Sequence, residues 1–137
     1  MTLNLKIHHL GKIVDNIPKQ YKFYQELGFK TVSGFDKKLL DKKQCVLVGA
    51  VKKGSVLIEL LEPYGKNSPV ASFLKTGQGF HHICYQTKIL EATIEIFKKN
   101  LHCRQITPVA VSVWDKRPVV FFISSAMEIV ELIGPKK

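Results

Sequence analysis

The chain has 137 residues, of which 45% are hydrophobic, and this length and composition predict one domain with a buried core. Lys and Arg number 21 against 11 Asp and Glu, which gives a net charge of +10 with neutral His. The lysines occur as scattered pairs and not as one stripe interleaved with aromatic residues. This pattern disfavours nucleic-acid binding, is typical of a solvated surface, and is compatible with an anionic small-molecule partner.

The opening residues, MTLNLKIHHL, lack the charged segment and apolar run of a signal peptide. No apolar run approaches the roughly eighteen residues that span a membrane. We therefore expect a cytoplasmic protein with no membrane partner. The three cysteines are odd in number and lack C-x-x-C spacing, which predicts free thiols and not disulfides or a thiolate metal site.

Internal similarity divides the chain into two halves, because the pair His8-His9 recurs as His81-His82. Each pair lies in a short apolar segment, residues 6–14 and 79–85. An amphipathic stretch with helical spacing follows each segment, at residues 18–27 and 90–99, with Asn16 as the expected cap of the first helix.

Short β-rich runs follow each predicted helix. They are residues 29–32, 44–51 and 55–61 in the first half, and 103–106, 119–123 and 127–133 in the second. Lys53-Gly54 is the expected hairpin turn between two of them. The prediction is an α+β fold in one domain, residues 1–137, built from two tandem βαβββ modules. Module one covers about 5–64, a linker helix lies within 65–78, and module two covers about 79–135.

Two glutamates repeat with almost the spacing of the histidines. His82 follows His9 by 73 residues, and Glu131 follows Glu59 by 72. Because successive strand side chains face opposite sides of a sheet, each glutamate shares a face with apolar residues two positions away. A buried carboxylate is costly unless it is paired or bound to a metal. The same argument does not decide which histidine of each pair shares that face.

One histidine from each pair and the two glutamates, on four strands, suit a divalent first-row metal such as Co, Mn, Zn, Ni or Fe. With four protein ligands, an octahedral ion keeps two positions for water or substrate. The alternative is a core in which these His and Glu side chains pair with each other or with Lys. The repetition of both residue types favours the metal.

Several stretches resemble the vicinal oxygen chelate (glyoxalase/bleomycin resistance/dioxygenase) superfamily, and within it the methylmalonyl-CoA epimerases. IELLEPYGKNSPVASFL, residues 58–74, and GQGFHHICY, residues 77–85, resemble the central segment of those epimerases. KIHHLGKIV and YKFYQELGF resemble the family's opening strand and helix, and MEIVELIG has the position of its last ligand strand. The resemblance covers nearly the whole chain and implies a curved, half-open mixed β-sheet that forms a cleft.

Carried over one residue at a time, the resemblance implies metal ligands at His9, Glu59, His82 and Glu131. It implies a metal-dependent isomerase, an epimerase that transfers a proton α to a thioester or ketone carbonyl. Glu131 is the expected catalytic acid or base on one face of the substrate, and Glu59 on the other. A further carboxylate proposed as a base in some epimerases would fall near Leu47, where this chain has no acid.

Two alternatives share the fold. A glyoxalase I-like lactoylglutathione lyase would use the same four ligands, and bacterial glyoxalase I often has Glu where epimerases often have Gln at the position of Glu59. A non-catalytic resistance-type protein would bind a small molecule, although such proteins commonly lack the four ligands. A ring-cleaving dioxygenase is disfavoured, because its Fe(II) needs more open positions than four protein ligands leave.

The substrate expected from the resemblance is an anionic thioester. Lys116 and Arg117 are the best candidates to bind it, since Arg grips phosphate or carboxylate with two parallel hydrogen bonds, although a solvated pair explains them equally well. The resemblance and the exposed strand edges of such modules favour a homodimer.

Overall fold

The computed structural model describes residues 2–137, which fall into two compact units. The first-half unit is His9–His81, and the second-half unit consists of residues 2–8 and His82–Lys137. The division falls inside two strands, β1 (Lys6–Ile13) and β6 (Gly79–Gln86). The module bounds given above remain a prediction. Of the described residues, no helix is long and apolar enough to cross a membrane.

The first-half unit orders its strands β2-β4-β5-β1, and β3 pairs with β4. β4 is antiparallel to β2, β3 and β5, whereas β1 and β5 run parallel. Besides β1, its elements are α1 (Ile17–Glu26), β2 (Lys30–Thr31), β3 (Leu39–Asp41), β4 (Val46–Lys53), β5 (Val56–Pro63) and the 3₁₀ helix η1 (Ala71–Thr76).

The second-half unit repeats this plan, with the order β6-β10-β9-β7 and with β8 paired to β9. β6 and β10 run parallel, and β9 is antiparallel to β10, β7 and β8. Its elements, besides β6, are α2 (Leu90–Lys99), β7 (Arg104–Gln105), β8 (Ala110–Val111), β9 (Pro118–Ile123) and β10 (Ile129–Ile133). The predicted α+β class with a mixed sheet is confirmed.

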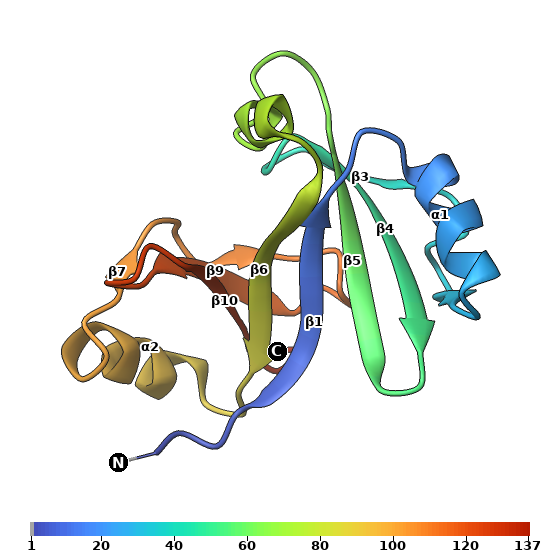
Figure 1. Ribbon diagram of the computed structural model, residues 1–137. Helices are drawn as coiled ribbons and strands as arrows, with labels where there is room; N and C mark the ends of the chain where they lie inside the picture. Colours follow the sequence, from blue (N-terminus) through green and yellow to red (C-terminus); the bar gives the residue numbers. More distant parts are fainter. Residues whose placement is uncertain (1) are drawn as a thin grey trace. The chain divides into compact units, whose positions relative to one another are not determined.

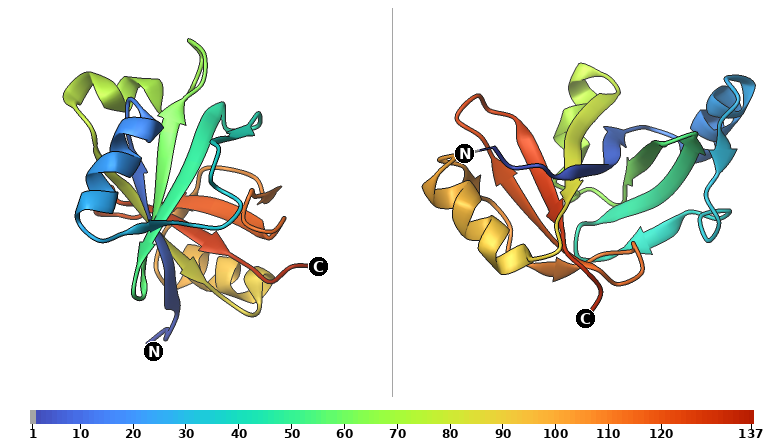
Figure 2. Two further views of the ribbon diagram at one scale, coloured as in Figure 1. Left: turned by 90° about the vertical axis from the view of Figure 1, so that its right-hand side faces the viewer. Right: turned by 90° about the horizontal axis from the view of Figure 1, so that it is seen from below.

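In each unit the helix lies against one face of the sheet (Figures 1 and 2), and buried apolar side chains form a core between them. Under α1 the buried side chains are Val14, Ile17, Tyr24, Val51, Ile58 and Leu60. Under α2 they are Leu90, Phe97, Val120, Phe122 and Leu132. On β5 and β10 these core residues alternate with Glu59 and Glu131, so each helix covers the face of its sheet opposite to the glutamate.

The N-terminus of α1 is held by two side chains. Asn16 caps the helix as predicted, since its Oδ1 accepts a hydrogen bond from the Lys19 N–H at 2.9 Å. Glu62 Oε1 accepts one from the Ile17 N–H at 2.9 Å, and its negative charge suits a helix N-terminus. Glu62 therefore fixes α1 on β5, in addition to pairing with Lys38 at 3.3 Å.

Gly49 on β4 lets α1 approach the sheet closely. A Cβ atom at this position would lie 2.6 Å from Tyr21 Oη and 2.8 Å from Ile17 Cγ2, which is closer than atoms pack. We expect Gly49→Ala to lower the free energy of unfolding by about 1–3 kcal/mol, as overpacking does. Gly79→Ala is the control, because its added Cβ would meet Phe73 Cε1 at an ordinary 3.8 Å. Urea unfolding curves of both variants test this, and equal stabilities would contradict it.

Tyr21 fastens α1 to the loop before β3 and to β4. Its hydroxyl donates a hydrogen bond to Phe35 O at 2.7 Å and accepts one from the Ala50 N–H at 3.2 Å. Burial raises the pKa of Tyr21, the Ala50 N–H opposes this, and the negative charge of Asp36 adds to it. The neutral phenol thus contributes stability below the unfolded-state pKa of about 10, and this contribution is lost as pH rises through the folded-state pKa.

We therefore expect Tyr21→Phe to destabilise the protein by about 1 kcal/mol at neutral pH, since two hydrogen bonds are lost. The stability difference from wild type should shrink as pH rises above about 10. Denaturant unfolding of the two proteins at pH 7 and at stepped alkaline pH measures this. A stability difference between the two proteins that stayed constant with pH would contradict the prediction that ionisation of Tyr21 destabilises the fold.

Candidate functional site

The first-half unit contains a buried His–Glu pair. His9 on β1 is fully buried and Glu59 on β5 is 6% exposed. His9 Nε2 lies 3.4 Å from Glu59 Oε1. Leu61, two residues after Glu59 on β5, is buried as well. Because alternate residues of a strand share a face, the Glu59 carboxylate lies on a buried, apolar face.

The second-half unit contains an equivalent pair. His82 on β6 is 4% exposed and Glu131 on β10 is 3% exposed. His82 Nε2 lies 3.2 Å from Glu131 Oε1. The structure thus brings the four predicted ligands together as two pairs, each within one unit.

The strand register builds both pairs in the same way. Glu59 is paired with Gly11 across parallel β1 and β5, and Glu131 is paired with Cys84 across parallel β6 and β10. In each case the histidine precedes the paired residue by two positions, so it lies on the same face as the glutamate. The sequence repeat of 73 and 72 residues is therefore a repeat of three-dimensional geometry as well.

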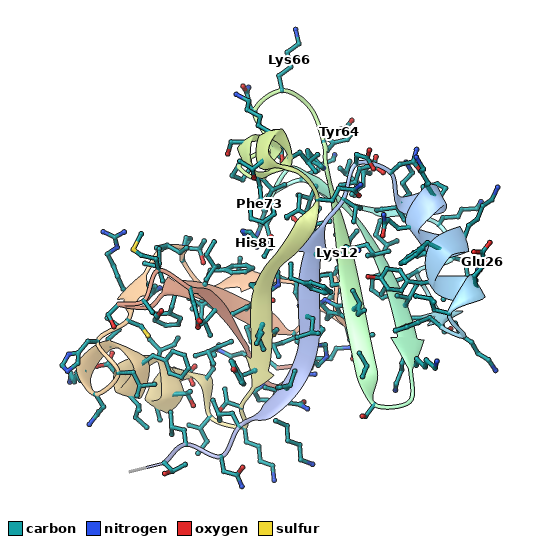
Figure 3. The ribbon with its side chains drawn as sticks, viewed as in Figure 1. Lys12, Glu26, Tyr64, Lys66, Phe73 and His81 are labelled. Atoms are coloured by element: carbon teal, nitrogen blue, oxygen red, sulfur yellow. The ribbon has the colours of Figure 1, made fainter. Side chains whose placement is uncertain are left out.

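The other histidine of each repeat lies on the opposite face of its strand. The rings of His8 and Trp114 meet edge to face at 5.1 Å, and those of His81 and Phe73 do so at 5.6 Å. Figure 3 shows His81 and Phe73 next to each other beside η1. His9 and His82 are consequently the histidines that share a face with the glutamates, a point that alternation in the sequence left open.

The spacing within each pair suits two neighbouring ligands of one ion. Metal–nitrogen and metal–oxygen bonds of about 2.0–2.2 Å at 90–110° place the two donor atoms about 3.0–3.4 Å apart. The observed separations of 3.4 and 3.2 Å agree with this. Burial of both carboxylates also favours a cation beside them. Two imidazoles and two carboxylates are residues that could hold a metal ion.

The surroundings of the two glutamates differ. Ala50 is the residue of β4 opposite Glu59, whereas Phe121 is the residue of β9 opposite Glu131. The Phe121 ring packs edge to face against His82 at a centroid distance of 5.1 Å. A methyl group therefore neighbours one glutamate and an aromatic ring the other.

β4 adds no acid to the face that carries Glu59. Leu47 packs toward α1, on the opposite face, so the residues to consider are Val46, Val48 and Ala50. Asp41 on β3 is paired with Val46 and shares this face. Val46 lies four residues from Ala50, which is about 13 Å along the strand, too far for Asp41 to act beside Glu59.

The predicted substrate-binding residues lie between β8 and β9. Lys116 is exposed and has φ +57°, and Arg117 is half-buried. Arg117 Nε donates a hydrogen bond to Gly134 O at 2.8 Å, which ties this loop to the end of β10. Trp114, in the same loop, is buried and packs against His8. Substrate binding by Lys116 and Arg117 remains a prediction.

The sequence is similar to known proteins. The pattern of the Glyoxalase/Bleomycin resistance protein/Dioxygenase superfamily matches residues 8–103. The mitochondrial methylmalonyl-CoA epimerase of Homo sapiens is 30% identical over 97 residues, which are 69% of this chain and 53% of the human protein. An uncharacterised protein of Bacillus subtilis is 35% identical over 92 residues, 66% of this chain and 63% of that protein. The chain thus spans little more than half of the human epimerase.

Solved structures share the fold. A hypothetical protein from Bacillus halodurans superposes with a TM-score of 0.85 at 27% identity, covering 98% of this chain and 97% of that one. Methylmalonyl-CoA epimerase from Mycobacterium tuberculosis superposes with a TM-score of 0.82 at 18% identity, covering 96% and 88%. The family match over residues 8–103 and the fold agree with the resemblance seen in the sequence. The chain belongs to the glyoxalase/bleomycin resistance/dioxygenase superfamily, also called the vicinal oxygen chelate superfamily.

Proposed function

We propose that this protein is a metal-dependent isomerase that moves a proton α to the carbonyl of a thioester, as a methylmalonyl-CoA epimerase does. The observation that carries the proposal is the pair of buried His–Glu contacts built at the same register in both units. A repeated core would need repeated apolar residues, but it would not need repeated buried charge.

In this proposal, His9, Glu59, His82 and Glu131 together hold one divalent ion of the first row. When bound, such an ion acts as a Lewis acid and stabilises the negative charge that develops on a carbonyl oxygen as the neighbouring proton leaves. The donor chemistry supports this, since neutral imidazole nitrogen and carboxylate oxygen suit Zn, Mn, Co, Ni and Fe alike.

The two glutamates are proposed to move the proton. Glu131 takes it from, or returns it to, one side of the α carbon, and Glu59 serves the other side. In such a two-carboxylate epimerisation, one group removes the proton as a base on one face of the α carbon, and the other returns a proton as an acid on the opposite face. The face of β4 beside Glu59 is apolar at Val46, Val48 and Ala50. The second carboxylate is therefore assigned to a ligand and not to a separate base.

Relatives support a CoA thioester as the substrate class. The human and mouse relatives are methylmalonyl-CoA epimerases. Solved epimerase structures include complexes with 2-nitronate-propionyl-CoA and with methylmalonyl-CoA. A net charge of +10 suits an anionic substrate, and Lys116 and Arg117 are proposed to contribute to its binding.

Metal content tests the ligand set. We expect gently purified wild-type protein to carry close to one equivalent of a divalent metal by elemental analysis. His82→Ala should lose it, because one of the four donors is removed. His81→Ala is the matched control and should retain it, since His81 packs on Phe73. If wild-type protein contained no metal and did not bind added Co²⁺ or Ni²⁺, the four residues would form two His–Glu contacts without a metal. That result would favour a non-catalytic protein that binds a small molecule.

Turnover tests the role of Glu131. Glu131→Gln keeps an oxygen that can bind metal but cannot exchange a proton, so we expect kcat on methylmalonyl-CoA to fall about 10²–10⁴-fold with metal retained. Hydrogen–deuterium exchange at the α carbon, followed by NMR, reports each proton transfer. Full turnover with bound metal in this variant would disprove the assignment.

The same assay run on a glutathione hemithioacetal separates the two enzyme alternatives. Activity on methylmalonyl-CoA alone supports the epimerase. Activity on the hemithioacetal alone would replace it with a glyoxalase I-like lyase. The four ligands serve both reactions, so only the substrate distinguishes them.

A further inference from the structure

A basic hollow of about 480 Å³ lies at the edge of the first-half unit, where β2 meets the end of β4. Its lining includes three lysines, Lys30, Lys52 and Lys53, and the hydroxyl residues Thr31 and Ser33. No Asp or Glu is among its lining residues. A lining with three positive charges and no carboxylate suits an anion.

Two of these lysines stand directly opposite each other. Lys30 on β2 is paired with Lys52 on β4 in the antiparallel ladder. Like charges in this arrangement destabilise a sheet. Within residues 2–137, neither ammonium group forms a hydrogen bond or ion pair with another side chain. An anion between them would remove the repulsion.

Protection of a sheet edge explains only part of this arrangement. Lysines on edge strands prevent pairing with other chains, and Lys30 on β2 fits that role. Lys52 does not, because β4 is flanked by β2 on one side and β5 on the other. Protection of the sheet edge therefore does not explain why Lys52 lies opposite Lys30.

The third lysine is positioned by the fold. Lys53 Nζ donates a hydrogen bond to Leu27 O at 2.7 Å, at the C-terminus of α1, where a cation is favourable. Lys53 lies on the other face of β4 from Lys52, since adjacent strand residues point to opposite sides. It adds positive charge to the rim of the hollow while serving the helix.

The hollow is close to the candidate ligand Glu59. Lys52 is paired with Leu57, and Glu59 lies two residues further along β5 on the same face. The diagonal between Lys52 and Glu59 is then about 7–8 Å between Cα atoms. Lys30, being opposite Lys52, shares this face as well. Lys30, Lys52 and Glu59 therefore lie on the same face of the sheet.

We propose that Lys30 and Lys52 form a binding site for the phosphate groups of a small molecule. Lysine binds phosphate as a point charge, and the two ammonium groups together suit a doubly charged anion. Two sources share this chemistry: the phosphate-bearing end of an acyl-CoA substrate, which rests on the proposed function, or a separate nucleotide. The site itself does not depend on the reaction.

Isothermal titration calorimetry with adenosine 3′,5′-bisphosphate, at low ionic strength, tests the site. We expect saturable binding to wild type, with affinity lowered at least tenfold in the double variant Lys30→Gln/Lys52→Gln. The matched control Lys42→Gln/Lys43→Gln removes the same charge from exposed positions between β3 and β4 and should bind like wild type. Adenosine, which lacks phosphate, should not bind.

Absence of binding to wild type, or an equal loss in both double variants, would overturn the proposal. In the second case only the net charge of the protein would matter. Circular dichroism of each variant confirms that it is folded. Because this measurement needs neither metal nor turnover, it stands even if the protein has no epimerase activity.

Steady-state kinetics then separate the two sources. If the site binds the substrate, Lys30→Gln/Lys52→Gln raises KM for methylmalonyl-CoA at least tenfold, with kcat nearly unchanged. Shortening the substrate to the pantetheine thioester, which lacks the nucleotide, should abolish this difference between variant and wild type. An unchanged KM, with bisphosphate binding lost, assigns the site to a separate nucleotide.

Discussion

The cost of burying a carboxylate on an apolar sheet face is the constraint on which this structure depends. Glu59 and Glu131 are almost completely removed from solvent, and each is stabilised by a histidine on the neighbouring parallel strand. Parallel neighbours cannot be joined by a tight turn. The chain between β1 and β5, and between β6 and β10, must therefore cross over, and it does so through a helix and antiparallel strands. This crossover places each histidine strand beside its glutamate strand.

In each unit the helix packs against one face of the sheet, and the His–Glu pair lies on the other face. On the first-half unit, α1 is fastened by Asn16, Glu62 and Tyr21, and Gly49 lets it pack closely. None of these contacts lies on the face of Glu59. Substitutions on the helix side are therefore expected to change unfolding more than binding. The buried His and Glu side chains are thus kept apart from the apolar core under each helix.

The faces of the strands and the cap of α1 could be predicted from the sequence, because they depend on short-range patterns. Alternation placed Glu59 and Glu131 on apolar faces, and the cap at Asn16 follows from residue type and spacing. The strands β3 and β8 were not predicted, because their pairing with β4 and β9 depends on register between segments, which no short-range pattern records. The strand predicted from residue 127 begins at Ile129, because Met127 has φ +65° and belongs to the turn.

Features that depend on register between distant segments were not legible. Alternation alone did not choose His9 over His8, because both neighbours of that pair are apolar. The facing of Lys30 and Lys52 likewise required the pairing of β2 with β4, which no local pattern records. The hydrogen bond from the Ile17 N–H to Glu62 Oε1 joins residues 45 apart and likewise depends on the fold.

The difference between Ala50 and Phe121 has a consequence for how such a protein changes over generations. When a module is duplicated, the residues around the equivalent glutamates are the same in both copies. A substitution in one copy then makes the two copies differ, unless the other copy mutates in the same way. Here the residue opposite Glu59 is Ala50, with a methyl group, and the residue opposite Glu131 is Phe121, with an aromatic ring. The two halves thus differ in the side chain opposite each glutamate. A substitution at position 50 changes the space beside Glu59 and leaves the contact of Phe121 with His82 intact, so the two neighbourhoods can change independently.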